Sequence, residues 1–260
     1  MFPQHASERH CAGGCLSRRV LRSLQRERAS AFTLLELLIV IGIIALLLVL
    51  IAPAFTTIKS AGDVISAAYT IKGVLDTART YAKANNTYTW VGFAGSIGPN
   101  TDPNLITGQV EVAIVTSKDG TNLWSANNAL PPDKLTQVGK MITLNNIHIG
   151  DTGIPQNNGT EFESRATVDD DHRISTSANT PYSFTVQQTT FNKWIQFSPR
   201  GEALVHGGNF SIVRAAEVGV LPTHGTTLAV TFNPATNTYS GNLVAIQISG
   251  FGGDVRIYRR

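Results

Sequence analysis

The hydrophobic pattern begins with an unbroken apolar run over residues 32–55 that contains one charged side chain, Glu36. Its 24 residues would form roughly 36 Å of α-helix, against about 30 Å for the hydrocarbon core of a bilayer. The run therefore predicts a membrane-spanning helix, and it is longer than the roughly 7 to 15 residues of a cleavable signal core. A signal anchor carrying one chance acid is the plain alternative.

Glu36 sets this run apart from an ordinary anchor. An unpaired carboxylate in hydrocarbon costs on the order of 3 kcal/mol, so the side chain requires a cationic partner. The run contains no Lys or Arg. Cleavage before Phe32 would create an α-amino group that is cationic below a pKa of about 8. Because a straight helix does not fold its own terminus back by a full turn, a neighbouring copy of the chain is the expected donor.

An amphipathic helical pattern follows, with apolar residues three and four positions apart. These apolar residues are Ile58, Ala61, Val64, Ile65, Ala68, Ile71, Val74, Leu75, Ala78, Tyr81 and Ala82. Asn85 and Asn86 predict the helix end, since Asn tolerates the left-handed conformation there. One helix over residues 32–84 would be roughly 80 Å long. Pro53 is expected to kink it, because proline removes a backbone donor and clashes with the preceding turn.

Beyond residue 86 the period changes to the alternation of strands. The predicted strands cover residues 88–93, 109–116, 141–149, 182–187, 193–197, 226–232, 243–249 and 255–258. A segment over 212–220 fits a strand or a short helix. A helix followed by strands predicts an α+β fold in which the long helix packs on one face of an antiparallel sheet. The stretches at 95–104 and 150–181 are expected to be surface loops, as insertions rather than binding surfaces.

Charge divides the chain into a leader and a remainder. Two acids, Glu8 and Glu27, stand against six arginines in residues 1–31, a net of +4: Arg9, Arg18, Arg19, Arg22, Arg26 and Arg28. Since the whole chain carries +3, residues 32–260 carry −1. This balance gives no argument for nucleic-acid binding. The arginines predict that the leader stays in the cytoplasm and that the carboxyl side crosses the membrane.

Cysteine and histidine usage favours a structural protein over an enzyme. Cys11 and Cys15 lie in the leader without a second ligand pair, so residues 32–260 can form no disulfide. No nucleophile elbow, H-E-x-x-H helix or P-loop is present, and we expect no catalytic residues and no resident metal or cofactor. The acidic run at residues 169–171 leaves calcium as an alternative, but it lacks the spacing of a known calcium loop, and a solvated charged loop is favoured.

The segment Ala31-Phe32-Thr33-Leu34-Leu35-Glu36 resembles the prepilin signature of type IV pilins and type II secretion pseudopilins. The resemblance implies that a prepilin peptidase cuts between Ala31 and Phe32 and methylates the amine of Phe32. It also implies that Glu36 assists assembly and that Pro53 is the helix-kinking proline of many members. The implied partners are other pilin or pseudopilin subunits, the peptidase and an assembly platform in the bacterial inner membrane.

Two stretches near the carboxyl end extend the resemblance. Residues 195–203 resemble the F-x-P-x-G hairpin of H-type minor pseudopilins, and residues 245–257 resemble their closing hairpin. Glycines in these turns are expected at positive φ.

The sequence thus divides into a basic leader at 1–31 that is removed, a transmembrane and assembly half of the helix at 32–55, an amphipathic half at 56–86, and a periplasmic β-rich domain at 87–260. The expected function is that of a structural subunit of a pseudopilus or pilus. A singly anchored periplasmic enzyme or binding domain is the rival, because fold alone does not assign function.

Overall fold

The computed structural model describes eight stretches of the chain, and residues 50–60, 163 and 232 are described by their backbone only. The stretches are residues 32–95, 107–123, 130–150, 162–168, 183–204, 214–233, 235–236 and 238–260. The chain divides into two compact units, Met1–Leu48 and Val49–Arg260.

One helix, α1 (Leu34–Ala84), contributes to both units. It begins two residues later than predicted because Thr33 caps its first turn. It ends at Ala84, as predicted, and Asn86 has a φ of 49°. That left-handed residue reverses the chain direction, so that the amide of Thr87 donates to the carbonyl of Ala82 over 3.0 Å. The helix continues through Pro53 without a break, and the kink stays a prediction.

The strands form two antiparallel sheets, where the sequence predicted one. The first has the order β3-β2-β1-β7-β8, and the second has the order β10-β9-β13-β14 with β4 also paired to β9. Their bounds are β1 (Thr89–Gly95), β2 (Gln109–Ser117), β3 (Leu135–Asn145), β4 (Ile147–Ile149), β7 (Lys193–Phe197), β8 (Ala203–Leu204), β9 (Ala215–His224), β10 (Thr227–Leu228), β13 (Val244–Ser249) and β14 (Val255–Arg259). The α+β class is confirmed.

Four shorter strands and two short 3₁₀ helices complete the described structure. Strands β5 (Phe184–Val186) and β6 (Thr189–Phe191) form one hairpin, and β11 (Thr231–Asn233) and β12 (Thr238–Ser240) form another. The 3₁₀ helices are η1 (Pro132–Lys134) and η2 (Phe162–Ser164).

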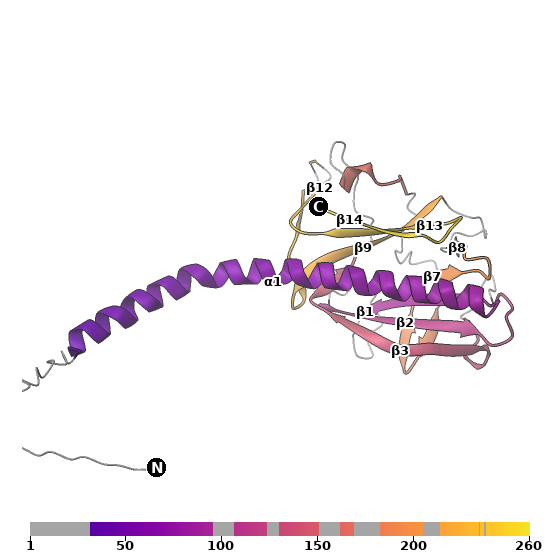
Figure 1. The fold of residues 1–260 in the computed structure, drawn as a ribbon, viewed down its shortest axis with the longest axis horizontal. Coiled ribbons are helices and arrows are strands. Elements are labelled where there is room, and N and C mark those ends of the chain that lie inside the picture. Colours follow the sequence, from indigo (N-terminus) through magenta and orange to yellow (C-terminus); the bar gives the residue numbers. More distant parts are fainter. Residues whose placement is uncertain are drawn as a thin grey trace, which may run out of the picture. The chain divides into compact units, whose positions relative to one another are not determined.

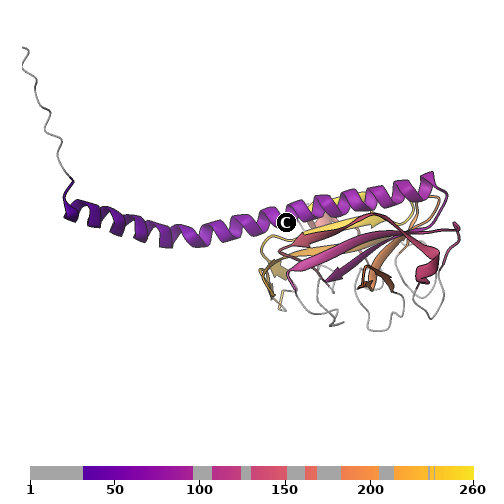
Figure 2. The ribbon, with the colours of Figure 1, turned by 90° about the horizontal axis from the view of Figure 1, so that it is seen from below.

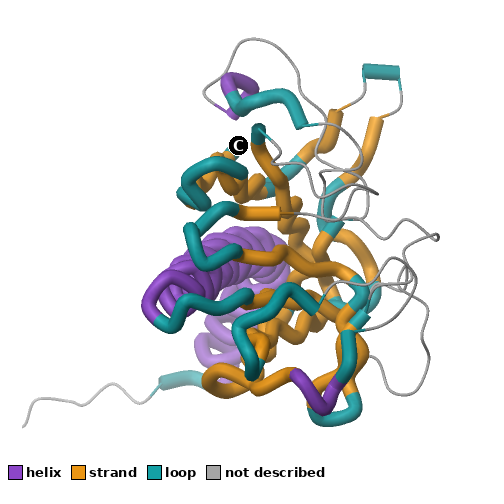
Figure 3. The backbone as a smooth tube through the Cα atoms, turned by 90° about the vertical axis from the view of Figure 1, so that its right-hand side faces the viewer, coloured by secondary structure: helices purple, strands orange, loops and turns teal. Residues whose placement is uncertain are grey.

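The main core lies between α1 and the two sheets, which gather on one side of the helix (Figure 3). From α1 it contains the buried side chains of Val64, Ala67, Ala68, Ile71, Val74, Leu75, Ala78 and Ala82. These meet Phe93 and Phe197 from the first sheet and Ile246 from the second. Figures 1 and 2 show this part of α1 running along the strands. From Val64 onward, the apolar positions three and four apart therefore form the face that the sheets cover.

A second apolar layer covers the other face of the first sheet. Its centre is the stacked pair Phe184 and Phe191 of the β5–β6 hairpin, whose ring centroids are 5.1 Å apart. The pair sits directly on Gly92 of β1, where a Cβ atom would lie 2.4 Å from the ring of Phe184. Only glycine leaves room for this contact, so residue 92 fixes where the hairpin packs.

Several predicted strand boundaries were wrong. The run at 141–149 is two strands in different sheets, because Asn146 has a φ of 60° and turns the chain from β3 into β4. The run at 226–232 is divided between β10 and β11. The ambiguous segment at 212–220 is a strand where the structure describes it, as part of β9.

Candidate functional site

The first turn of α1 is a capping box built from Thr33 and Glu36. The Thr33 amide and hydroxyl each donate to the Glu36 carboxylate over 3.2 Å. In return the Glu36 amide donates to the Thr33 hydroxyl over 3.2 Å. This exchange satisfies backbone donors that the start of a helix leaves unpaired. The Thr-x-x-Glu spacing is a known sequence signal for this cap, which was not among the sequence predictions.

The capping box changes the expectation about where Glu36 reaches. The sequence predicts that Glu36 pairs with a neighbouring copy, because a straight helix does not bring its own terminus to this acid. In the single chain the carboxylate instead reaches back to Thr33, one residue after Phe32. The side chain of Phe32 is 77% exposed at the same end. The carboxylate is therefore hydrogen-bonded to Thr33, the residue that follows the predicted new terminus at Phe32. Ala31, the other side of the predicted cut, lies outside the described residues.

An apolar surface follows this turn on every side of the helix. All residues from Leu34 to Val49 are exposed in the single chain. A helix that is apolar all round is stable only where other apolar groups cover it. Residues 50–55 of the predicted span have no described side chains, which includes the side chain of Pro53. Among the side chains that the structure does describe, no helix is both long and apolar enough to cross a bilayer.

The two glycine hairpins noted in the sequence meet at the far end of α1. Gly201 and Gly253 have φ angles of 86° and 67°, which confirms the predicted positive values. A Cβ atom on Gly253 would lie 2.3 Å from the carbonyl oxygen of Gly201 and 3.0 Å from the side chain of Arg79. The Asp254 carboxylate is 3.2 Å from the Arg79 guanidinium. The hairpins are thus one junction that holds both sheets against the helix.

Part of the predicted loop at 150–181 is packed, which corrects the view that the whole stretch is a surface insertion. Arg165 is 4% exposed, and its Nε lies 3.1 Å from the carboxylate of Glu217 on β9. Its guanidinium also lies 4.0 Å above the centre of the Phe162 ring. Gln247 of β13 donates to both Glu217 and the carbonyl of Ala166. A buried cation requires such partners, and no local sequence signal identifies them.

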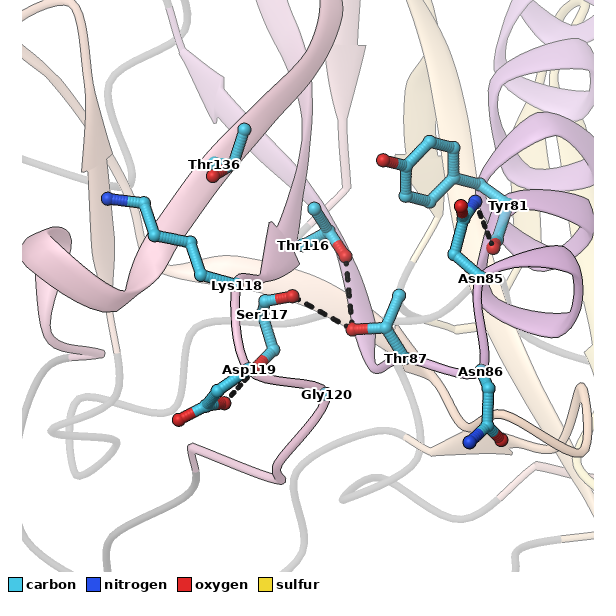
Figure 4. A pocket seen from close by; sticks show the side chains of 10 residues that line it. All are labelled: Tyr81, Asn85, Asn86, Thr87, Thr116, Ser117, Lys118, Asp119, Gly120 and Thr136. Atoms are coloured by element: carbon cyan, nitrogen blue, oxygen red, sulfur yellow. Dashed lines mark hydrogen bonds between the residues drawn. The ribbon is translucent and has the colours of Figure 1, made fainter.

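An open pocket of about 480 Å³ lies where α1 ends against β2 and β3 (Figure 4). Its lining residues are Tyr81, Asn85, Asn86, Thr87, Thr116, Ser117, Lys118, Asp119, Gly120 and Thr136. Hydrogen bonds from the Thr121 side chain and amide and from the Ser117 hydroxyl hold the pKa of Asp119 well below its usual range. The carboxylate is thus occupied in closing its own turn, and the lining includes neither His nor Cys.

The described residues bring together no group of three or more His, Cys, Asp and Glu side chains that would hold a metal. The acidic run at 169–171, the leader with Cys11 and Cys15, and most of the stretches at 95–104 and 150–181 lie outside the described residues. The calcium alternative therefore stays a prediction.

The family model described as the prokaryotic N-terminal methylation motif matches residues 26–52. This match supports the resemblance to type IV pilin-like proteins and indicates a substrate of a prepilin peptidase. The match contains Ala31, Phe32 and Glu36 and stops before Pro53. Neither a curated protein nor a solved structure matches the chain.

Proposed function

We propose that this chain is a structural subunit of a filament, a minor pseudopilin or pilin. It is cut between Ala31 and Phe32, methylated on the amine of Phe32, and assembled through the helix that follows. The observation that carries the proposal is the carboxylate of Glu36 at the start of an apolar helical surface inside the matched methylation motif.

The proposed mechanism is mechanical. The apolar surface at 34–49 is covered by lipid before assembly and by the same surface of neighbouring subunits afterwards. The orientation is single-pass in a bacterial inner membrane, with the leader inside and residues 87–260 in the periplasm. Pro53 kinks the helix between these regions. The glycine junction and the two hairpins support an H-type minor pseudopilin of a type II secretion system as the particular subunit. The expected partners are other subunits, the peptidase and the assembly platform.

The capping box gives Glu36 a second role, as a helix cap, beside its proposed role in an ion pair. Replacing Glu36 with alanine removes both roles at once. In an isolated subunit the carboxylate stabilises the first helical turn, and in the filament it neutralises the amine of a neighbour. Gln retains the oxygen that a capping box uses but has no charge. Glu36→Gln therefore retains the cap while it removes the ion pair.

The experiment compares Glu36→Ala and Glu36→Gln in cells that build the filament. We expect both variants to be cut at Phe32, and both to lose incorporation by roughly a hundredfold or more, because breaking a buried ion pair costs about 3 to 5 kcal/mol. Asp76→Asn, which removes one charge from the exposed part of the same helix, should assemble normally. Normal assembly of Glu36→Gln would reduce Glu36 to a helix cap. Normal assembly of both variants would favour the rival, a singly anchored enzyme or binding domain.

A further inference from the structure

Two exposed arginines lie at the end of the second sheet: Arg259, the last residue of β14, and Arg260 directly after it. We refer to them as the arginine cluster. Neither of them forms an ion pair with any residue that the structure describes. The Arg260 guanidinium donates to the backbone carbonyl of Tyr239 on β12. The cluster is therefore a concentration of positive charge on a unit, Val49–Arg260, whose formal charges sum to zero.

The direction of β14 relative to α1 is fixed at its first residues. Asp254, just before the strand, contacts Arg79 near the carboxyl end of α1. The next residue, Val255, accepts a 3.0 Å hydrogen bond from Lys72, which lies two turns earlier on the helix. The strand therefore runs away from the glycine junction and toward the amino-terminal part of α1 within the same unit.

The register of the second sheet shows where β14 ends. Arg259 is paired with Val244, and Val244 is paired with Val220 of β9, which also pairs with β4. Asn146, the residue before β4, donates to Asp63 of α1 over 2.7 Å. The cluster consequently lies at the end of the domain where α1 arrives from residues 50–60. Figures 1 and 2 mark the C-terminus at this end.

The distance from this end to the apolar run is short. Phe55 precedes Asp63 by eight positions, which is roughly 12 Å of helix. The screening length at 0.1 M salt is about 10 Å, so charges at this end would interact with the surface that holds the apolar run. Arginine suits phosphate groups in particular, because its planar guanidinium donates two parallel hydrogen bonds.

We propose that the arginine cluster docks the domain on anionic lipid headgroups beside its own anchor before the subunit joins a filament. This inference rests on the proposed membrane anchoring of residues 32–55. Charged side chains on the edge strand β14 would also keep another strand from pairing with it. That role alone does not explain why the charges are positive, because negative side chains would serve equally well. Two positive charges at the end of the domain nearest the anchor would also attract an anionic surface. Each arginine near such a surface favours the docked state about fivefold, so two favour it about 25-fold.

The test uses the processed full-length chain in nanodiscs of phosphatidylcholine, alone or mixed with phosphatidylglycerol. Ser240 is exposed and follows Tyr239. Residues 32–260 contain no cysteine, so Ser240→Cys gives one site for a fluorophore that nitroxide lipids quench near the headgroups. The double variant Arg259→Gln, Arg260→Gln is compared with a charge-matched control. The control changes the exposed residues Lys118 and Lys134 to Gln at the opposite end of the domain.

We expect phosphatidylglycerol to raise the docked population at least tenfold in the parent chain and in the lysine control, and added salt to reverse the rise. The arginine variant should show no such rise. Equal quenching in both lipids, or a rise that survives in the arginine variant, would overturn the docking. Quenching that appears only when a second subunit is added would assign the cluster to an acidic neighbour instead. A chain that does not enter the nanodisc refutes the anchoring and the docking together, whereas insertion without lipid-dependent quenching refutes the docking alone.

Discussion

The two parts of α1 differ in how they bury their apolar side chains. Leu34 and Leu46 are 85% and 65% exposed, whereas Ile71 and Leu75 on the later part are fully buried. The later part has one apolar face, which the two sheets cover, while the earlier part is apolar all round and finds no cover within the described chain. One helix thus packs against a folded domain with its later half and presents an uncovered apolar surface on its earlier half.

The largest expected loss of stability comes from breaking the buried ion pair between Arg165 and Glu217. Arg165→Ala should lower the free energy of unfolding by about 3 to 5 kcal/mol, because it leaves Glu217 buried without its cation. Asp76→Asn breaks the exposed pair with Lys72, whose side chains are 35% and 45% exposed, and should cost under about 1 kcal/mol. Urea unfolding of the processed chain in mild detergent, followed by tryptophan fluorescence, measures both. Equal losses would contradict the burial argument.

A matched pair of truncations compares the two parts of the helix directly. Ile71→Ala should destabilise the domain by about 2 to 5 kcal/mol, since it leaves a cavity between the helix and the sheets. Leu46→Ala removes an exposed side chain and should change domain unfolding by less than about 0.5 kcal/mol. Leu46→Ala should nevertheless reduce incorporation into the filament, and by more than its small effect on domain stability explains. A domain equally sensitive to both changes would mean that the two halves are not separate in function.

A pair of glycine substitutions on the two sides of the helix–sheet contact should have effects of opposite sign. Gly253→Ala places a methyl group against the Gly201 carbonyl at a φ of 67° and should cost about 1 to 3 kcal/mol. Gly73→Ala adds a methyl group on the exposed face of α1, where nothing lies within 4 Å. It should stabilise the domain by about 0.5 to 1 kcal/mol, because alanine is the better helix former. The two midpoints of urea unfolding should move in opposite directions.

The smallest expected effect concerns pH and the turn after β2. Because the pKa of Asp119 is lowered in the folded chain, its contribution to stability is present above the unfolded value of about 3.9. That contribution is lost only as the pH falls through the folded value. Thr121→Val removes the side-chain donor and should return the pKa toward its ordinary value, as read from the carboxyl carbon shift by NMR. An unchanged titration in this variant would assign the lowered pKa to another cause.

Local signals predicted the elements better than their assembly. The end of α1 at Asn85 and Asn86 and the positive φ of Gly201 and Gly253 were predictable because single residue types determine these conformations. The division of 141–149 at Asn146 was missed, since the alternation continues through a residue that turns the chain. The presence of two sheets could not be predicted, because register depends on partners far away in the sequence.

The candidate site shows the same division. The apolar run and the place of Glu36 within it were predictable from the order of the residues alone. The Thr33 cap was predictable from the Thr-x-x-Glu pattern. The pairing of Arg165 with Glu217, 52 residues apart, depends on the packed fold and has no local signature. The arginine cluster likewise gains its meaning only from the direction in which β14 runs.

The most direct test of the central claim is mass spectrometry of the chain extracted from membranes of cells that contain a prepilin peptidase. The account predicts a mature protein that begins with N-methyl-Phe32 and lacks residues 1–31, and a chain that retains its leader when the peptidase is absent. A chain that keeps its leader beside an active peptidase, or one cut at a position other than Ala31–Phe32, would contradict it.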